Sequence, residues 1–184
     1  QTMNTKKFIW DKVINSFTSP RVLDVAYGTS NGLFWWEKGL DEGGLLVVDP
    51  LQRNLDPLKA GGIPTMKADL ETSDLYGRLN QKKFEVIVCD KTLSSLSEKG
   101  GSKLLSTFNK LVADEGYLCL VAQCRFLPGR RGWRVPRYEF AKHGDALLSL
   151  YKDFDLTYKR VFKRNAQTNT CEVFFVWQKR KAQD

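Results

Sequence analysis

The fold is decided by the stretch PRVLDVAYGTSNG at residues 20–32. Residues 21–25 form an apolar run with one acid near its end, which is typical of a buried strand. A turn that contains Gly28 follows, and the apolar residues after Asn31 are typical of a helix. A strand, a glycine-bearing turn and a helix in this order place a ligand crevice at the carboxyl end of a parallel strand. Gly28 and Gly32 leave room for a ligand beside the backbone, and the helix start offers unpaired N–H groups.

The composition is that of a folded and basic protein. The chain has 184 residues, of which 42% are hydrophobic and 12% aromatic, and we expect one domain over residues 1–184. Lys and Arg number 29 against 21 Asp and Glu, and this net charge of +8 favours a polyanionic partner such as nucleic acid. No apolar run approaches the ~18 residues of a membrane span, and the start of the chain has no signal-peptide core. We therefore expect a protein of the cytoplasm or nucleus that is neither secreted nor membrane-bound.

The cysteine pattern argues against a metal site. Cys89, Cys119, Cys124 and Cys171 form no C-x-x-C pair, and His143 is the single histidine. We expect the cysteines to be buried as small apolar residues in a reducing compartment. A zinc site and Ser-His-Asp chemistry both need more histidine or a different spacing.

Helical and strand-like runs alternate along the rest of the chain. We expect helices at 6–17, 31–39, 53–60, 72–81, 100–112 and 140–152, and strands at 21–25, 45–48, 63–68, 84–89, 117–122, 154–162 and 171–178. This alternation predicts an α/β domain with a mainly parallel sheet and helices on both faces. The turn-rich loop between the last two strands predicts an antiparallel hairpin.

Acids follow four of the predicted strands, at the point where each strand ends. They are Asp24, Asp49, Asp69 and Asp90. Because the carboxyl ends of parallel strands meet at one edge of a sheet, we expect these side chains to line one crevice. A carboxylate at the position of Asp49 can accept both hydroxyls of a ribose. One such acid alone is as often a helix cap or a turn residue, whereas four at one edge favour a binding site.

With these acids, residues 20–32 resemble motif I of the class I S-adenosylmethionine-dependent methyltransferases, hydrophobic-Leu-Asp-x-Gly-x-Gly-x-Gly. Only one of its three glycines is kept here. The resemblance implies a Rossmann-like, seven-stranded sheet whose last strand inserts antiparallel, and S-adenosylmethionine as cofactor. In the family the first acid positions the methionine end of the cofactor, the second holds the ribose, and the third, with its neighbour, meets the adenine. The implied cofactor contacts are Asp24, Ala26, Tyr27, Gly28, Ser30, Asn31, Asp49, Pro50, Asp69, Leu70 and Asp90.

Three residues resemble part of the Lys-Asp-Lys-Glu tetrad of the ribose 2'-O methyltransferases of the FtsJ and viral cap type. Lys12 lies in the helix before motif I, Asp90 ends the fourth strand, and Glu172 lies on the last strand. The second lysine of the tetrad belongs late in the fifth strand, where LVAQCR at 120–125 has none. A lysine there can deprotonate a ribose hydroxyl, which an arginine cannot do at neutral pH. Lys91 is the candidate substitute.

Two other functions stay open. The motif DKTLSS at 90–95 is similar to the Asp-Lys-Gly/Ser-Thr-Leu-Asp of small eukaryotic protein-lysine methyltransferases. A catalytically inactive, methyltransferase-like binding module is the other alternative, because Ala26 and Ser30 replace glycines of motif I and the second lysine is missing. The Asn/Asp-Pro-Pro-Tyr/Phe motif of amino-methylating enzymes is absent, which disfavours that reaction.

A basic segment follows the fifth predicted strand. RFLPGRRGWRVPR at 125–137 has five arginines, no acid, and interleaved aromatic residues, and we expect it to be irregular. Arginine forks bind phosphates and aromatic rings stack on bases, so the segment predicts an RNA-contacting loop. Its candidate substrate contacts are Arg125, Arg130, Arg131, Trp133, Arg134 and Arg137. The sequence thus predicts an RNA methyltransferase, with ribose 2'-O transfer ahead of base methylation, and leaves open the oligomeric state and membership of a larger polyprotein.

Overall fold

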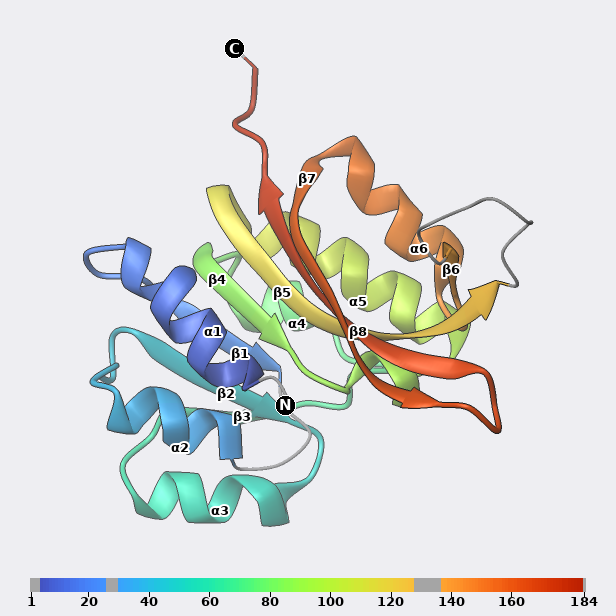
Figure 1. Cartoon of the computed structure of the whole chain (residues 1–184). Coiled ribbons are helices and arrows are strands. Elements are labelled where there is room, and N and C mark those ends of the chain that lie inside the picture. Colours follow the sequence, from blue (N-terminus) through green and yellow to red (C-terminus); the bar gives the residue numbers. More distant parts are fainter. Residues whose placement is uncertain (1–3, 26–29, 128–136, 184) are drawn as a thin grey trace.

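Strands and helices alternate along the chain (Figure 1), whose computed structural model describes residues 4–25, 30–127 and 137–183. The strands are β1 (Val22–Val25), β2 (Leu45–Asp49), β3 (Thr65–Lys67), β4 (Phe84–Cys89), β5 (Val112–Leu127), β6 (Arg137–Phe140), β7 (Phe154–Asn165) and β8 (Thr170–Lys179). The α-helices are α1 (Thr5–Lys12), α2 (Ser30–Glu37), α3 (Gln52–Ala60), α4 (Leu75–Arg78), α5 (Glu98–Leu111) and α6 (Gly144–Ser149). Short 3₁₀ turns are η1 (Ile14–Ser16), η2 (Leu93–Ser95) and η3 (Leu150–Lys152).

The strands form one sheet in the order β3-β2-β1-β4-β5-β8-β7, and β6 pairs with β5 outside this path. The pairs from β3 to β5 are parallel, whereas β8 runs antiparallel to both β5 and β7. The predicted mainly parallel sheet of seven strands with a closing antiparallel hairpin is therefore confirmed. The short strand β6 is an addition that the sequence pattern did not predict.

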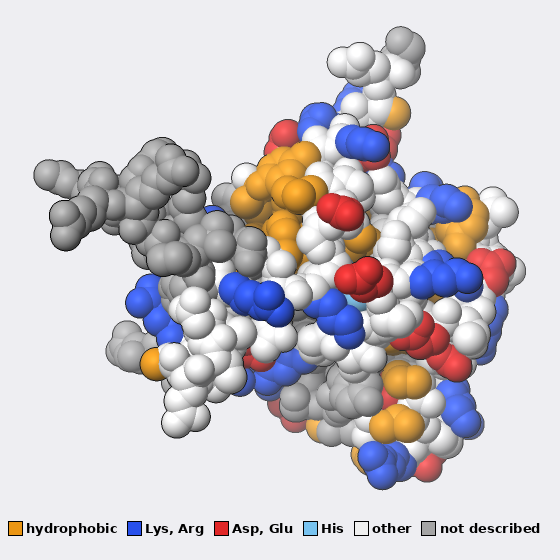
Figure 2. All heavy atoms as spheres, turned by 90° about the vertical axis from the view of Figure 1, so that its right-hand side faces the viewer, with side chains coloured by type: hydrophobic (Ala, Val, Ile, Leu, Met, Phe, Trp, Pro, Cys, Tyr) orange, Lys and Arg blue, Asp and Glu red, His pale blue; other side chains and the backbone are white. Residues whose placement is uncertain are grey.

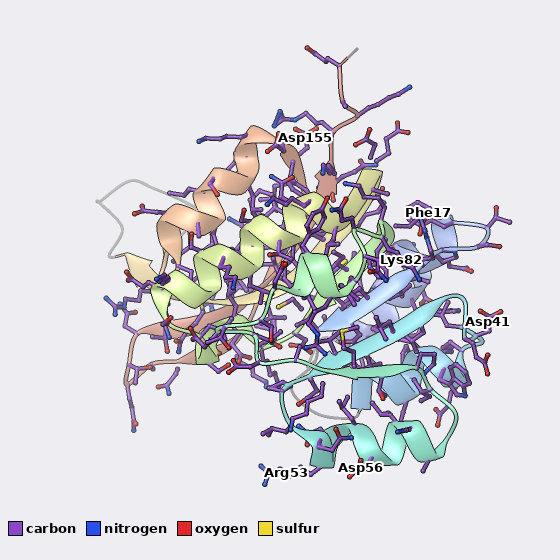
Figure 3. All side chains as sticks on the ribbon, turned by 180° about the vertical axis from the view of Figure 1, so that it is seen from behind. Phe17, Asp41, Arg53, Asp56, Lys82 and Asp155 are labelled. Carbon is purple, nitrogen blue, oxygen red and sulfur yellow. The ribbon has the colours of Figure 1, made fainter. Side chains whose placement is uncertain are left out.

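Helices cover both faces of the sheet (Figure 1). The cluster beneath α1, α2 and α3 includes Trp35 and Phe174, and the cluster beneath α4, α5 and α6 includes Phe108 and Trp177; all four side chains are fully buried. Seen from behind, Asp41 and Lys82 lie on loops that lead into β2 and β4, at the amino end of the parallel strands (Figure 3). The carboxyl ends, where the predicted acids lie, are at the opposite edge.

Local backbone geometry explains where the predicted helices fall short. The run at 6–17 divides into α1 and η1 at Val13. The weakly helical run at 72–81 keeps only α4, because Asn80 and Gln81 both have positive φ angles, 52° and 58°. The last predicted helix starts at Gly144, since His143 before it is left-handed with φ 60°.

The expectation of an irregular segment over 125–137 is wrong at both ends. Residues 125–127 continue β5, because β8 pairs with it at Arg125↔Thr170 on one side and β6 pairs with it at Arg125↔Glu139 on the other. A strand with partners on both sides satisfies its backbone hydrogen bonds beyond the packed core. Residues 128–136 lie outside the described part of the chain.

Candidate functional site

Three acids share one face of the sheet at its carboxyl edge. Asp24, Asp49 and Asp90 lie at the ends of the neighbouring strands β1, β2 and β4. Side chains alternate along a strand, and the residues two positions before these acids all lie in the cluster beneath α1, α2 and α3. The three carboxyl groups therefore face the same helices.

Asp24 is a fully buried acid with one strong partner. Trp35 Nε1 donates a hydrogen bond of 2.6 Å to Asp24 Oδ2. Asp24 Oδ1 is buried and has no hydrogen-bond partner among the described residues. Burial raises the pKa of Asp24 to about 7, the Trp35 bond opposes this, and the charges of Asp90 and Asp49 add to it. A buried acceptor without a partner is costly, so this oxygen is a candidate contact for a donor from a ligand.

Asp49 and Asp69 instead order their own turns. Asp49 accepts from the Leu51 amide at 2.7 Å and from Asn54 Nδ2 at 3.2 and 3.1 Å. These bonds use much of its acceptor capacity before any ribose arrives. Asp69 is exposed and accepts from the Glu71 amide at 2.9 Å, as in an Asx turn. Of their neighbours, Pro50 is half-buried and Leu70 is in the core.

Asp90 borders a cleft of about 470 Å³. Asn31 Nδ2 donates to Asp90 Oδ2 at 3.4 Å, and Asp90 Oδ1 is buried without a hydrogen-bond partner among the described residues. The buried Thr92 hydroxyl donates to the Val25 carbonyl at 2.9 Å, which fastens the loop after β4 to the end of β1. The cleft is lined by Asn4, Thr5, Lys6, Asp90, Lys91, Phe162 and Lys163.

Three lysines, Lys6, Lys91 and Lys163, line this cleft, and one of them pairs with an acid. Lys163 Nζ lies 3.6 Å from Glu172 Oε2. A hydrogen bond with Lys91 raises the pKa of Lys163, and the charge of Glu172 raises it further. Lys91 and Lys163 have positive φ angles of 61° and 49°, and the second coincides with a bulge in β7. Such strained backbone is concentrated at functional sites, where the surroundings hold it in place.

Aromatic packing brings α1 to the cleft. Phe8 stacks on Tyr158 of β7 at 4.3 Å between ring centroids and meets Phe174 of β8 edge-on at 5.6 Å. These contacts hold the first turn of α1, with Lys6, beside β7. The cleft is thus built from the start of α1, the end of β4 and the bulge of β7.

No family model and no curated protein sequence matches this chain. Solved structures do match its fold. TehB from Haemophilus influenzae aligns with a TM-score of 0.61 and 14% identity over 91% of this chain, which spans only 59% of TehB. The N-methyltransferase NodS from Bradyrhizobium japonicum, in complex with S-adenosyl-L-homocysteine, aligns at 0.61 and 15% over 96% of this chain and 86% of NodS. The 1,6-didemethyltoxoflavin-N1-methyltransferase from Burkholderia thailandensis aligns at 0.67 and 13% over 96% and 77%.

The fold is that of the class I S-adenosylmethionine-dependent methyltransferases. The cyclase SpnF also aligns, with a TM-score of 0.71 and 11% identity, so this methyltransferase fold does not by itself fix a reaction. The reaction depends on the side chains of the site.

Within the methyltransferase fold, the first lysine of the site is not the one that the sequence pattern singled out. Lys12 is exposed at the last turn of α1, and it is Lys6, at the first turn, that lines the cleft. Both lysines precede motif I on one helix, and the sequence alone does not say which end of the helix points to the carboxyl edge. Lys12 therefore does not line this cleft, and Lys6 does.

Lys163 is the residue that sequence reasoning missed. The predicted strand ended at residue 162, three positions before the observed end of β7, and so left out Lys163. The strand position expected to hold the second lysine has Gln123, which is exposed and pairs directly with Glu172 across β5 and β8. Glu172 also pairs with Phe162 on its other side, so Lys163 lies next to it. A register count across the hairpin loop was the signal that could have found it.

Part of the predicted site lies outside the described residues. This applies to Ala26, Tyr27 and Gly28 of the cofactor turn and to Arg130, Arg131, Trp133 and Arg134 of the basic segment. Ser30 begins α2 and Arg137 begins β6, but only their backbone is described. Arg125 is exposed on β5.

Gly32 serves packing and not ligand approach, which corrects the expectation from the sequence. A Cβ atom on Gly32 would lie 2.9 Å from Val47 Cγ2 and 3.4 Å from Leu58 Cδ1. The absent side chain lets α2 approach β2 and α3 closely. Gly32 therefore shapes the floor beneath the site and not the site itself.

The cysteines are buried and free, as the sequence predicted. Among the described residues, no group of three or more His, Cys, Asp or Glu side chains could hold a metal ion. In the same part of the chain, no helix has the length and apolar character needed to cross a membrane.

Proposed function

We propose that this chain is an S-adenosylmethionine-dependent methyltransferase that methylates a ribose 2'-hydroxyl of RNA. The proposal is carried by one observation, the gathering of lysines and acids at a single cleft on the carboxyl edge of a methyltransferase fold. The members of this lysine–acid cluster are Lys6, Asp90, Lys91, Lys163 and Glu172.

The acids on the shared face fit the cationic part of the cofactor. Asp24 Oδ1 and Asp90 Oδ1 are buried acceptors without partners among the described residues. A buried acceptor of this kind is costly unless a donor reaches it, and an ammonium group supplies charged donors. Asp24 would hold the methionine end of S-adenosylmethionine, and Asp49 would offer the ribose whatever lone pairs its turn leaves. When bound, the cofactor supplies an activated methyl group.

The cluster supports transfer to a hydroxyl. Methylation of a hydroxyl needs alignment of the oxygen with the methyl group and removal of a proton. Lys91 lines the same cleft and follows Asp90 directly in the chain, so its amine is the candidate base. Lys163 and Lys6 would hold the negative charge that develops on the oxygen, and Asp90 would orient the reacting groups.

The charge of the chain supports RNA as the substrate. The net charge is +8, and Lys and Arg side chains are spread over the face that Figure 2 shows, with acids among them. Arg125 and Arg160 are exposed on β5 and β7, the two strands that flank β8. Exposed arginines on the two strands beside β8 suit contacts with a phosphate backbone.

The test is incorporation of labelled methyl groups into RNA. The chain is incubated with labelled S-adenosylmethionine and RNA, which is then digested and separated into nucleosides. The proposal expects 2'-O-methylated nucleosides from the native chain and at least a tenfold loss in Lys91→Met and Asp90→Asn. Label on protein lysines in place of RNA would support the protein-lysine alternative. A chain with no affinity for cofactor would support the inactive binding module.

A further inference from the structure

The bond between Trp35 and Asp24 joins two side chains that are both fully buried. Its length is 2.6 Å, and it takes up only one of the two carboxyl oxygens. The other oxygen is buried with no partner among the described residues. Asp24 is thus held by Trp35 through one oxygen, while its other oxygen lacks a donor.

We infer that Trp35 is a positioning residue that holds Asp24 as the acceptor for the ammonium group of the cofactor, so that cofactor binding is coupled to release of a proton from Asp24. The inference deepens the proposed function and rests on it. Trp35 acts through Asp24 and touches neither cofactor nor substrate. Its indole N–H donates throughout and keeps its proton.

The groups around Asp24 decide its ionisation. From β4 it faces Asp90, from β2 it faces Asp49, and from α1 it faces Lys6. The Cys89 thiol of β4 also lies near it. Burial and the two carboxylates oppose a charge on Asp24, while Trp35 and Lys6 favour it, and its pKa settles at about 7. Near neutral pH the free chain therefore holds a mixture of protonated and ionised Asp24.

The proton balance of binding follows from this mixture. A protonated carboxyl group is a poor partner for an ammonium group, and an ionised one is a strong partner. When the ammonium group binds, the O–H bond of a protonated Asp24 breaks and the proton goes to the buffer. The cofactor changes neither its bonds nor its oxidation state in this step.

The first experiment measures Asp24 in the free chain. Carbon-13 carboxyl resonances of aspartate are titrated by NMR in the native chain and in Trp35→Phe. We expect the midpoint of Asp24 to rise by about one pH unit in Trp35→Phe, because a hydrogen bond to the ionised form is lost. Trp36→Phe is the matched control. Trp36 is the next residue on α2 and is half-buried, and the hydrogen bond to Asp24 comes from Trp35. An Asp24 midpoint that is the same in Trp35→Phe and the native chain would overturn the inference.

The second experiment measures binding of S-adenosylhomocysteine, which keeps the ammonium group, by calorimetry in buffers of different ionisation enthalpy. Below pH 7 the native chain should release close to one proton per ligand bound. At pH 7, Trp35→Phe should bind about fivefold more weakly than Trp36→Phe, because fewer molecules carry an ionised Asp24. Binding without proton release in the native chain would overturn the coupling.

The Asp24→Asn variant provides a second test if Trp35→Phe does not fold. The amide has the same shape as the carboxyl group, and its oxygen can still accept from Trp35. In this variant the proton release should disappear, and so should the weakening of ligand binding as the pH falls below 7. Ligand binding that still weakens at low pH in this variant would overturn the inference. If the native chain binds no S-adenosylhomocysteine at any pH, both the proposed function and the coupling are overturned. The NMR titration of the free chain tests only the Trp35–Asp24 pair.

Discussion

At the scale of single residues, Asp24 makes the stability of the fold depend on pH. Its pKa rises from an ordinary 3.8 to about 7 because it is buried. Below pH 3.8 the group is protonated in both the folded and the unfolded chain. Between about pH 4 and 7 the folded chain keeps a proton that the unfolded chain has lost, so stability falls as the pH rises through this window.

The Asp24→Asn variant should remove this dependence. The difference in unfolding free energy between variant and native chain should grow in favour of the variant from pH 4 to pH 7, by up to roughly 4 kcal/mol, and then stay level. Urea unfolding at several pH values measures it. Parallel stability curves for the two chains would contradict the buried, protonated acid.

Lys6 and Lys12 form a second comparison of single residues. They lie on the same helix, but only Lys6 lines the cleft. Lys6→Met should lower methyl transfer by about tenfold or more, which corresponds to about 1.4 kcal/mol of transition-state stabilisation. Lys12→Met should stay within about twofold of the native rate. Equal losses of methyl transfer in the two variants would mean that the positive charge of the helix matters and that the position of Lys6 at the cleft does not.

At the scale of elements, the approach of α2 to the sheet depends on Gly32. Gly32→Ala places a methyl group 2.9 Å from Val47 Cγ2, so the helix or the strand must shift. We expect a loss of about 1–3 kcal/mol in unfolding free energy, as for other overpacked cores. Gly43→Ala is the control, because its nearest contact is Asp41 Oδ1 at 3.5 Å, an ordinary distance. Thermal unfolding of both variants compares them directly, and equal stability would mean that α2 moves at no cost.

The elements also show what the sequence could predict. Strand β4 was predicted at its observed bounds, because a short, continuous apolar run between polar turns is typical of a buried strand. The extension of β5 and the existence of β6 were missed, since those residues are strands through pairing and not through apolar pattern. The acids at the strand ends could be placed from topology alone. Lys163 was missed because the predicted strand stopped at residue 162, and the bulge in β7 that sets its place beside Glu172 has no signal in the apolar pattern.

At the scale of the whole molecule, the net charge of +8 predicts how RNA binding responds to salt. Each phosphate contact that is lost reduces the slope of log affinity against log salt by about 0.7 for a single strand. Replacing Arg130 and Arg131 together with Gln should lower RNA affinity and flatten this slope by up to about 1.4. Filter binding at several salt concentrations measures both. An unaltered slope would mean that the two arginines contact no phosphate.

The strand order of the sheet has a consequence for how the chain becomes active as it is synthesised. In the described part of the chain β7 pairs with no strand except β8, and β8 is made after it. A nascent chain holds Lys6 and Asp90 early, but β7 has no neighbour to lie on until residues 170–179 have left the ribosome. Lys163 and Glu172 then reach the cleft together. Translation that stops before β8 would leave a chain with strands β1 to β5 and with Lys6, Asp90 and Lys91, but without the pair of Lys163 and Glu172.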